Sequence, residues 1–186
     1  GFSGEAPIIV AFGGSQGSSI INHMILNALH LFDRQKRPHL LLLCGQGQDK
    51  ESLEKMAQNL GIRARIVPFE QEMAYAYSVG DLFVSRSGAS AVAELSSFNK
   101  PAICIPYPFA KDDHQLKNAE ELMKGGRALI IEEQELSPER LFTDLFRLLQ
   151  MIANKSPSLK NLEKSIKKQF SQILLERLQK GGSLNG

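Results

Sequence analysis

The sequence predicts an α/β fold built on a doubly wound, six-stranded parallel sheet of the Rossmann-like kind. Two observations lead to this prediction. Short runs rich in Ile, Val and Leu recur along the 186 residues. Segments that begin and end with residues typical of helix termini alternate with these runs. Runs that are apolar on both faces are typical of parallel strands covered by helices on each side. Ligands of such sheets bind beyond the carboxyl ends of the strands, near the point where the strand order reverses.

The apolar runs and the residues that punctuate them set the expected elements in order. The expected strands are Ile8 to Phe12, Leu40 to Cys44, Ala64 to Phe69, Leu82 to Ser85, Ala102 to Pro106 and Ala128 to Ile131. The expected helices are Ser18 to Phe32, Asp49 to Leu60, Glu72 to Val79, Ala89 to Phe98, Asp113 to Lys124, and Ser137 to Ala153, the last led by Ser137-Pro138.

A further helix is expected from about residue 158 to 178. It places Leu162, Ile166, Phe170 and Ile173 on one stripe at helical spacing, so we expect this apolar face to be buried against another part of a protein. We therefore expect residues 1 to 156 to form a sugar-nucleotide-binding domain and residues 157 to 180 to form a terminal helix with an interdomain role. Residues 181 to 186 are expected to be a flexible tail.

Composition restricts the class of protein. Hydrophobic residues make up 42% of the chain, and a formal net charge of +2 excludes the basic excess of a dedicated nucleic-acid binder. Cys44 and Cys104 lie inside apolar runs, which predicts buried thiols in a reducing compartment. Without an apolar stretch of about 20 residues or a signal peptide, a soluble cytoplasmic chain is expected. The start at Gly1, without methionine, suggests that a longer protein extends upstream.

Two glycine-containing loops are candidate anion sites. The first expected strand ends in Gly13-Gly14-Ser15-Gln16-Gly17, and the fourth ends in Ser85-Arg86-Ser87-Gly88-Ala89; each loop opens a helix. Backbone N–H groups and the positive end of a helix dipole favour anions at such positions. The first loop lacks the spacing of a dinucleotide fingerprint or a P-loop, so a purely structural turn remains an alternative for it.

Glu94 lies about one turn into the helix that the second loop opens. A carboxylate there can accept two hydrogen bonds from the adjacent hydroxyls of a ribose, as acidic residues do in other nucleotide-binding folds. A carboxylate that is merely solvated is the alternative.

A polar cluster begins the helix after the fifth expected strand. Asp112 or Asp113 can cap that helix, which would fully explain the two acids. Gln115 and Asn118 share a helix face and offer both donors and acceptors, which suits the hydroxyl groups of a sugar. Simple solvation of the two amides is the alternative. The chain has no Asp-x-Asp metal signature, so neither metal nor cofactor is expected.

Taken together, these motifs resemble the MurG family of glycosyltransferases over nearly the whole chain. The resemblance is carried, in order, by Gly-Gly-Ser-Gln-Gly at 13 to 17, Phe69 to Met73 before Ala74-Tyr75-Ala76, Arg86-Ser87-Gly88-Ala89 with Glu94, Lys100-Pro101-Ala102 leading to Pro106, and Asp113-His114-Gln115 with Asn118-Ala119.

The resemblance implies the carboxyl-terminal half of a two-domain GT-B enzyme. This half holds UDP-N-acetylglucosamine, and the amino-terminal half, which would carry the general base, receives the lipid-linked muramyl-pentapeptide. The implied reaction is inverting transfer of N-acetylglucosamine in peptidoglycan synthesis, and thus in cell wall biogenesis, cell shape and division. It takes place at the inner face of the cell membrane, where the full-length enzyme is peripheral. By itself the chain is expected to bind the donor without transferring sugar.

The resemblance also implies roles for individual residues. Ser15 and its glycine loop would lie near the diphosphate, the backbone at Glu70 against uracil, and residues 89 to 94 along phosphate and ribose. The loop at 86 to 89 would stabilise charge on the leaving UDP, Gln115 and Asn118 would read the sugar hydroxyls, and His114 would lie near the diphosphate or sugar. The substrate-binding residues expected on this basis are Gly14, Ser15, Gln16, Gly17, Glu70, Arg86, Ser87, Gly88, Ala89, Ser90, Ala91, Val92, Ala93, Glu94, His114, Gln115 and Asn118.

Departures from the family pattern and rival functions remain. Ala91 stands where the family often has threonine, and Glu70 where it often has an apolar residue. Arg86 either adds its charge to the phosphate site or forms a structural ion pair.

A non-catalytic donor-binding subunit of a split lipid-linked N-acetylglucosamine transferase is the main alternative function, and a UDP-sugar epimerase is a weaker one.

Overall fold

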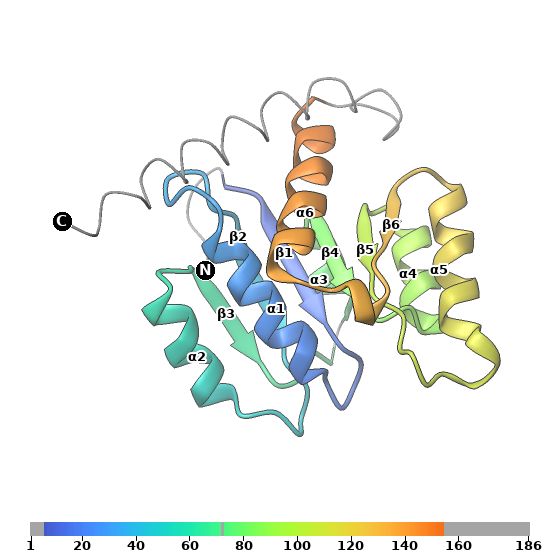
Figure 1. The fold of residues 1–186 in the computed structure, drawn as a ribbon, viewed down its shortest axis with the longest axis horizontal. Coiled ribbons are helices and arrows are strands. Elements are labelled where there is room, and N and C mark those ends of the chain that lie inside the picture. The colour runs from blue at the N-terminus through green and yellow to red at the C-terminus, as the bar shows by residue number, and fades with distance from the viewer. Residues whose placement is uncertain (1–5, 72, 155–186) are drawn as a thin grey trace.

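The computed structural model describes residues 6–71 and 73–154. Its strands form one parallel sheet in the order β3-β2-β1-β4-β5-β6, with helices on both faces (Figure 1). The doubly wound parallel sheet expected from the sequence is therefore confirmed. The helix expected near residues 158 to 178, the tail at 181 to 186 and the domain boundary at 156 lie outside the described residues.

The elements follow one another as alternating strands and helices. The strands are β1 (Ile8–Phe12), β2 (His39–Leu43), β3 (Ala64–Val67), β4 (Leu82–Ser85), β5 (Ala102–Cys104) and β6 (Ala128–Ile130). The helices are α1 (Ser19–His30), α2 (Lys50–Asn59), α3 (Met73–Val79), α4 (Ala89–Ser97), α5 (His114–Lys124) and α6 (Pro138–Ala153), with 3-10 turns η1 (Lys111–Asp113) and η2 (Glu133–Glu135).

Side chains on the two faces of the sheet form two hydrophobic cores. On one face, residues such as Ile9 and Leu42 pack against α1, α2 and α6. On the other, Val10 and Phe83 pack against α3 and α4. Strands buried on both faces must be apolar at every position, which is why β2 reads His-Leu-Leu-Leu-Leu and is buried throughout.

Four of the six expected strands end one or two residues later than the observed ones, and the other two end at the same residue. Pairing in β5 stops at Cys104, for example, although the Ile105 N–H still bonds to the Ser85 carbonyl at 2.8 Å. After β2, β5 and β6 the apolar run continues past the last ladder residue because the next side chain is also buried, whereas Phe69, which ends the run of β3, is exposed. Apolar runs therefore predict burial better than they predict the ends of pairing. Within the described residues, no helix is both long and apolar enough to span a bilayer.

The order of strands reverses between β1 and β4. Their parallel pairing aligns Phe12 with Ser85, the last residue of each strand, so the loops that follow begin side by side. The Arg86 N–H also bonds to the Phe12 carbonyl at 3.3 Å. In a doubly wound sheet the chain leaves these two strands in opposite directions, which opens a crevice between the loops.

Candidate functional site

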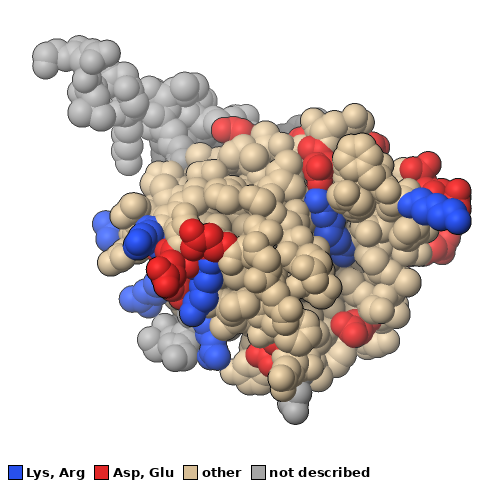
Figure 2. All heavy atoms as spheres, turned by 90° about the horizontal axis from the view of Figure 1, so that it is seen from below, with Lys and Arg blue, Asp and Glu red and all other residues tan. Residues whose placement is uncertain are grey.

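A pocket of about 810 Å³ lies at this switch point. It opens on the edge of the sheet where the strands end, which is the face seen in Figure 2. Uncharged residues form most of that face. The pocket is lined by Phe12, Gly13, Gly14, Ser15, Gln16, Gly17, Ser18, Leu43, Pro68, Phe69, Glu70, Met73, Arg86, Gly88, Ala89, Ser90, Ala91, Glu94, Tyr107 and Gln115.

The glycine loop after β1 is folded tightly against the loop after β2. Gly17 has a φ of +76°, and a Cβ at this position would lie 1.9 Å from the carbonyl oxygen of Cys44. Gly45 approaches Gly17 in return, since its Cβ would lie 2.3 Å from the Gly17 Cα. Only glycine fits such an approach of two backbones. The exposed residues Gly14, Ser15 and Gln16 are thereby held at the mouth of the pocket.

The two helix starts at the pocket differ in their capping. In α1 the hydroxyl of Ser18, the N-cap residue, accepts from the Ile21 N–H, although at 3.5 Å. In α4 the N-cap residue is Gly88, which has no side chain to cap the helix. The N–H groups at the start of α4 therefore have no capping side chain, and Ala89, Ser90 and Ala91 all line the pocket. An uncapped helix start combines free donors with a positive dipole end, which makes α4 the stronger anion site.

Arg86 connects three walls of the pocket. Its Nη1 donates to the carbonyls of Ile105 and Pro106 at 3.3 and 3.0 Å. Its Nη2 donates to the Ser18 hydroxyl at 3.1 Å and forms an ion pair with Glu133. The guanidinium also lies 5.3 Å from the centre of the Tyr107 ring. The structural ion pair that the sequence allowed for Arg86 is present, and Arg86 also lines the pocket.

Glu94 lies on α4 beyond the uncapped start, is half-buried and lines the pocket. Its neighbours Val92 and Ala93 do not line the pocket, because successive side chains of a helix point in different directions. Glu94 and the α4 start therefore share one concave surface.

The polar cluster after β5 is placed differently from the expectation. Asp113 occupies the N-cap position of α5, but its side chain makes no capping hydrogen bond. Asp112 and Asp113 have φ values of 54° and 53°, in the left-handed region. An N-cap side chain needs an extended backbone to reach the helix N–H groups, so the expectation that either acid caps α5 is wrong. Among the described residues, no group of three or more His, Cys, Asp or Glu side chains is arranged to hold a metal ion.

The amides of this cluster are both engaged with the pocket walls. The Gln115 side-chain oxygen accepts from the Tyr107 N–H at 3.1 Å, which leaves its NH₂ group for other acceptors. The Asn118 amide donates to the Ser87 carbonyl at 3.2 Å, which ties α5 to the loop before α4. His114 is exposed, and its Nδ1 lies 2.6 Å from the Lys111 carbonyl oxygen.

Most of the expected site residues converge on the one pocket. Those that line it are Gly14, Ser15, Gln16, Gly17, Glu70, Arg86, Gly88, Ala89, Ser90, Ala91, Glu94 and Gln115. Those that do not line it are Ser87, Val92, Ala93, His114 and Asn118. Ser87 is buried, and its carbonyl accepts a hydrogen bond from the Asn118 amide. Ligand contact by any of them stays a prediction.

Among the pocket residues that were not expected site residues are Phe69, Met73 and Tyr107. Phe69 is 50% exposed, Tyr107 is 45% exposed, and Met73 is half-buried beside them. Large side chains of this kind suit the flat face of a base or a sugar. A signal was available in the sequence, because Phe69 ends one apolar run and Tyr107 directly follows another, at the edge where ligands of parallel sheets bind.

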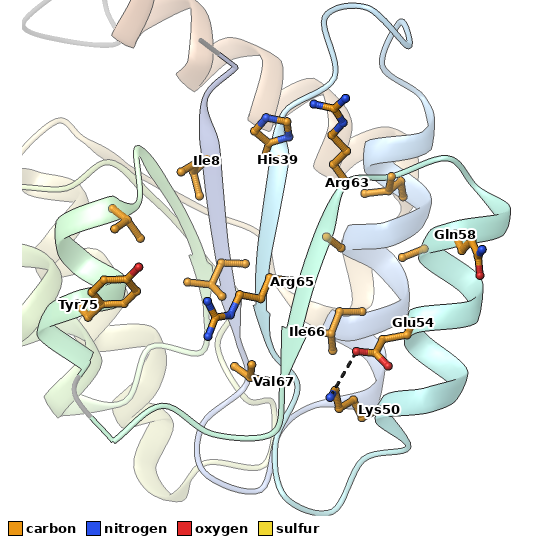
Figure 3. A pocket seen from close by; sticks show the side chains of 15 residues that line it. Ile8, His39, Lys50, Glu54, Gln58, Arg63, Arg65, Ile66, Val67 and Tyr75 are labelled. Carbon is orange, nitrogen blue, oxygen red and sulfur yellow. Dashed lines mark ion pairs between the residues drawn. The ribbon is translucent and has the colours of Figure 1, made fainter. Parts of the chain in front are cut away.

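A larger pocket, of about 1020 Å³, runs along the edge strand β3 (Figure 3). Arg63, Arg65 and an ion pair between Lys50 and Glu54 lie on it. Its helix start differs from that of α4, because the Asp49 carboxylate caps α2 by accepting from the Ser52 N–H at 3.0 Å. The donors of that helix start are partly used, so the switch-point pocket is the better candidate for an anionic ligand.

Comparisons with known proteins agree with this geometry. Residues 8–174 match the family described as "Glycosyltransferase family 28 C-terminal domain". A UDP-N-acetylglucosamine–N-acetylmuramyl-(pentapeptide) pyrophosphoryl-undecaprenol N-acetylglucosamine transferase of Nitrosococcus oceani is 42% identical over 140 residues, which is 75% of this chain and 39% of that protein. The chain thus spans about two-fifths of the length of this relative.

Solved structures give the same picture. The structure of Acinetobacter baumannii MurG superposes with a TM-score of 0.70 at 29% identity, covering 88% of this chain and 52% of that one. The calicheamicin glycosyltransferase CalG4 superposes with a TM-score of 0.63 at 15% identity, covering 97% of this chain and 43% of that one; at this identity only the fold is shared. The expected fold, that of the carboxyl-terminal half of a GT-B enzyme, is confirmed, and so is the resemblance to MurG proteins.

Proposed function

The chain belongs to the glycosyltransferase family 28 C-terminal domain family, and from this we propose that its switch-point pocket binds UDP-N-acetylglucosamine as the sugar donor. The relative from Nitrosococcus oceani bears the name of an N-acetylglucosamine transferase, which supports this choice of sugar.

One observation carries the proposal. The uncapped start of α4 and the Glu94 carboxylate lie on the same wall of the pocket, less than two turns apart on one helix. In a nucleoside diphosphate, the anionic phosphates and the vicinal diol of the ribose are separated by a distance comparable to that between the start of α4 and Glu94. The free N–H groups suit the anion, and the carboxylate suits the diol, whereas a carboxylate alone would repel the phosphates.

The remaining lining residues complete the proposed division of roles. Gly14, Ser15 and Gln16 face the diphosphate from the other loop. Phe69 supplies an aromatic face for uracil, and the backbone at Glu70 supplies hydrogen bonds to its edge. Gln115, through its free NH₂, and Asn118 with His114 recognise the hydroxyls of the sugar.

In the proposed reaction an acceptor hydroxyl attacks the anomeric carbon of the sugar with inversion. The bond from that carbon to the β-phosphate oxygen breaks, and negative charge gathers on the leaving UDP. The start of α4 stabilises this charge electrostatically. Arg86 contributes less than its formal charge, because Glu133 neutralises part of it.

The general base and the lipid-linked muramyl-pentapeptide site are proposed to belong to an amino-terminal partner domain. The complete enzyme would then act in peptidoglycan synthesis as a peripheral protein at the inner face of the cell membrane. We propose no metal ion and no cofactor for the transfer.

Calorimetry with the 186-residue chain tests the proposal. UDP and UDP-N-acetylglucosamine should bind, and UDP should bind more tightly than ADP or GDP, because the uracil contacts suit a pyrimidine. Equal affinities for all three diphosphates would refute a uridine site. The chain by itself should transfer no sugar to a lipid-linked acceptor, and turnover would contradict the placing of the acceptor site in a partner.

A further inference from the structure

Tyr77 of α3 has a buried hydroxyl with no evident structural use. The residue is 0% exposed, and its hydroxyl makes no hydrogen bond within the described part of the chain. A buried polar group without a partner costs free energy, and phenylalanine would fill the same volume without this cost. The hydroxyl therefore calls for an explanation outside the packing of the core.

The ring of Tyr77 is held in a fixed position by other aromatic rings. It stacks on Phe83 of β4 and on Phe98 at the end of α4, with 5.1 Å between centroids in each pair. Phe12 of β1 meets it edge-on at 6.4 Å. A ring clamped on both faces points its hydroxyl in one direction, so the direction of this O–H group is built into the core.

Glu94 is a neighbour of this aromatic stack. Phe98, which stacks on Tyr77, lies one turn after Glu94 on the same face of α4. Burial raises the pKa of Tyr77, and the neighbouring Glu94 carboxylate raises it further. Tyr77 therefore stays protonated and remains a donor over the whole physiological pH range.

We propose that Tyr77 is a positioning residue for Glu94: its fixed hydroxyl donates to one carboxylate oxygen and turns the other toward the ribose hydroxyls of the bound nucleotide. This inference rests on the proposed binding of a uridine nucleotide. Hydrogen bonds in binding sites are often long until the ligand is present, and this one shortens when the ribose fixes the carboxylate.

The proposal explains why a tyrosine stands in the aromatic stack. A glutamate side chain on a helix surface samples several rotamers, and ordering it costs conformational entropy. A fixed donor behind the carboxylate lowers that cost before the ribose arrives. Tyr77 thus contributes to affinity without touching the ligand, and only through the hydroxyls that Glu94 binds.

A thermodynamic comparison of two ligands tests this role. The ligands are UDP and 2′,3′-dideoxy-UDP, titrated calorimetrically into the wild-type chain and into the Tyr77→Phe variant. We expect Tyr77→Phe to weaken UDP by about 3- to 10-fold, the value of one hydrogen bond, and to change dideoxy-UDP by less than about 2-fold. A merely structural role would weaken both ligands equally, and that outcome would overturn the inference.

Matched variants separate the remaining outcomes. Tyr75→Phe removes a hydroxyl from the same helix, on a side chain that is 54% exposed and does not line the switch-point pocket, and should leave both affinities unchanged. Thermal unfolding of Tyr77→Phe checks that the core is intact. If wild type binds UDP better than dideoxy-UDP and Tyr77→Phe keeps the full difference, the inference fails while the proposed function stands. If wild type does not bind UDP, the proposed function fails first.

Discussion

Arg86 of the loop after β4 and Glu133 of η2 form an ion pair across 47 residues of chain. The two side chains are 11% and 22% exposed, so the pair is largely shielded from water. Since Arg86 also holds Ser18 and two carbonyls after β5, the pair links loops from β1, β4, β5 and β6 around one guanidinium.

Removing the acidic partner should therefore destabilise the protein measurably. Glu133→Gln leaves Arg86 with an uncompensated charge, and we expect a loss of about 1–2 kcal/mol in the free energy of unfolding. Glu121→Gln is the matched control, because its ion pair with Lys124 has side chains 68% and 69% exposed and should contribute almost nothing to stability. Urea unfolding measures both. Equal losses in the two variants would show that the Arg86 pair is no more than a surface contact.

Gly88 offers a substitution with opposite effects on stability and binding. Its φ of −63° suits an N-cap residue with a side chain, and a Cβ there would meet nothing within 4 Å. Gly88→Asp should cap α4 and stabilise the fold by a few tenths of a kcal/mol. The same carboxylate occupies the N–H groups proposed for the diphosphate, so UDP affinity should fall at least about 10-fold.

Thermal melting and calorimetry of Gly88→Asp check the two halves of this prediction. Gly88→Ala serves as the control, because it adds a Cβ without a capping group. A Gly88→Asp protein that binds UDP as tightly as Gly88→Ala would move the diphosphate away from the start of α4.

Glu94→Ala tests the ribose contact directly. We expect UDP binding to weaken by about 1.5–3 kcal/mol, the range for hydrogen bonds to a charged group, without loss of fold. Glu120→Ala removes an exposed carboxylate from α5, outside the pocket, and should leave affinity unchanged. If Glu94→Ala keeps native stability and full UDP affinity, the carboxylate is merely solvated.

The two cysteines should be unreactive in the folded protein. Burial raises the pKa of the Cys104 thiol to about 12 and also raises that of Cys44. The thiolate is the reactive form, so raising the pH from 8 to 10 should speed labelling of the unfolded chain and leave the folded chain nearly unlabelled. For Cys104 the folded state keeps its proton between the ordinary pKa of 9.0 and about 12, so its contribution to stability falls as the pH rises through that window.

Disulfide-exchange labelling with and without guanidinium measures this difference. Rapid labelling of either thiol under native conditions would show that the strand ends β2 and β5 open easily.

Much of the fold was predictable from the sequence because burial on both faces forces apolar runs. That requirement identified all six strands and their helices, within one or two residues at most ends. The two glycine loops and Glu94 followed from the rule that ligands bind where parallel strands end, and the structure brings them into one pocket.

The features that sequence reasoning missed depend on contacts between distant residues. No local pattern shows that Arg86 pairs with Glu133, or that Tyr77 stacks between Phe83 and Phe98. The capping error at Asp113 has a related cause. Residue type favoured a cap there, but the backbone conformation, which the surrounding loop sets, decides whether a side chain reaches the helix N–H groups.

The separation of β1 from β4 along the chain affects the order in which the site can form. Ile9 pairs with Leu82, whereas Ile9 and Leu40, its other neighbour, are less than half as far apart in sequence. The β1-α1-β2 unit can close early, but the pocket exists only after the longer loop has closed. A nucleotide should thus bind after the rate-limiting step of folding, slowing unfolding while leaving the refolding rate unchanged.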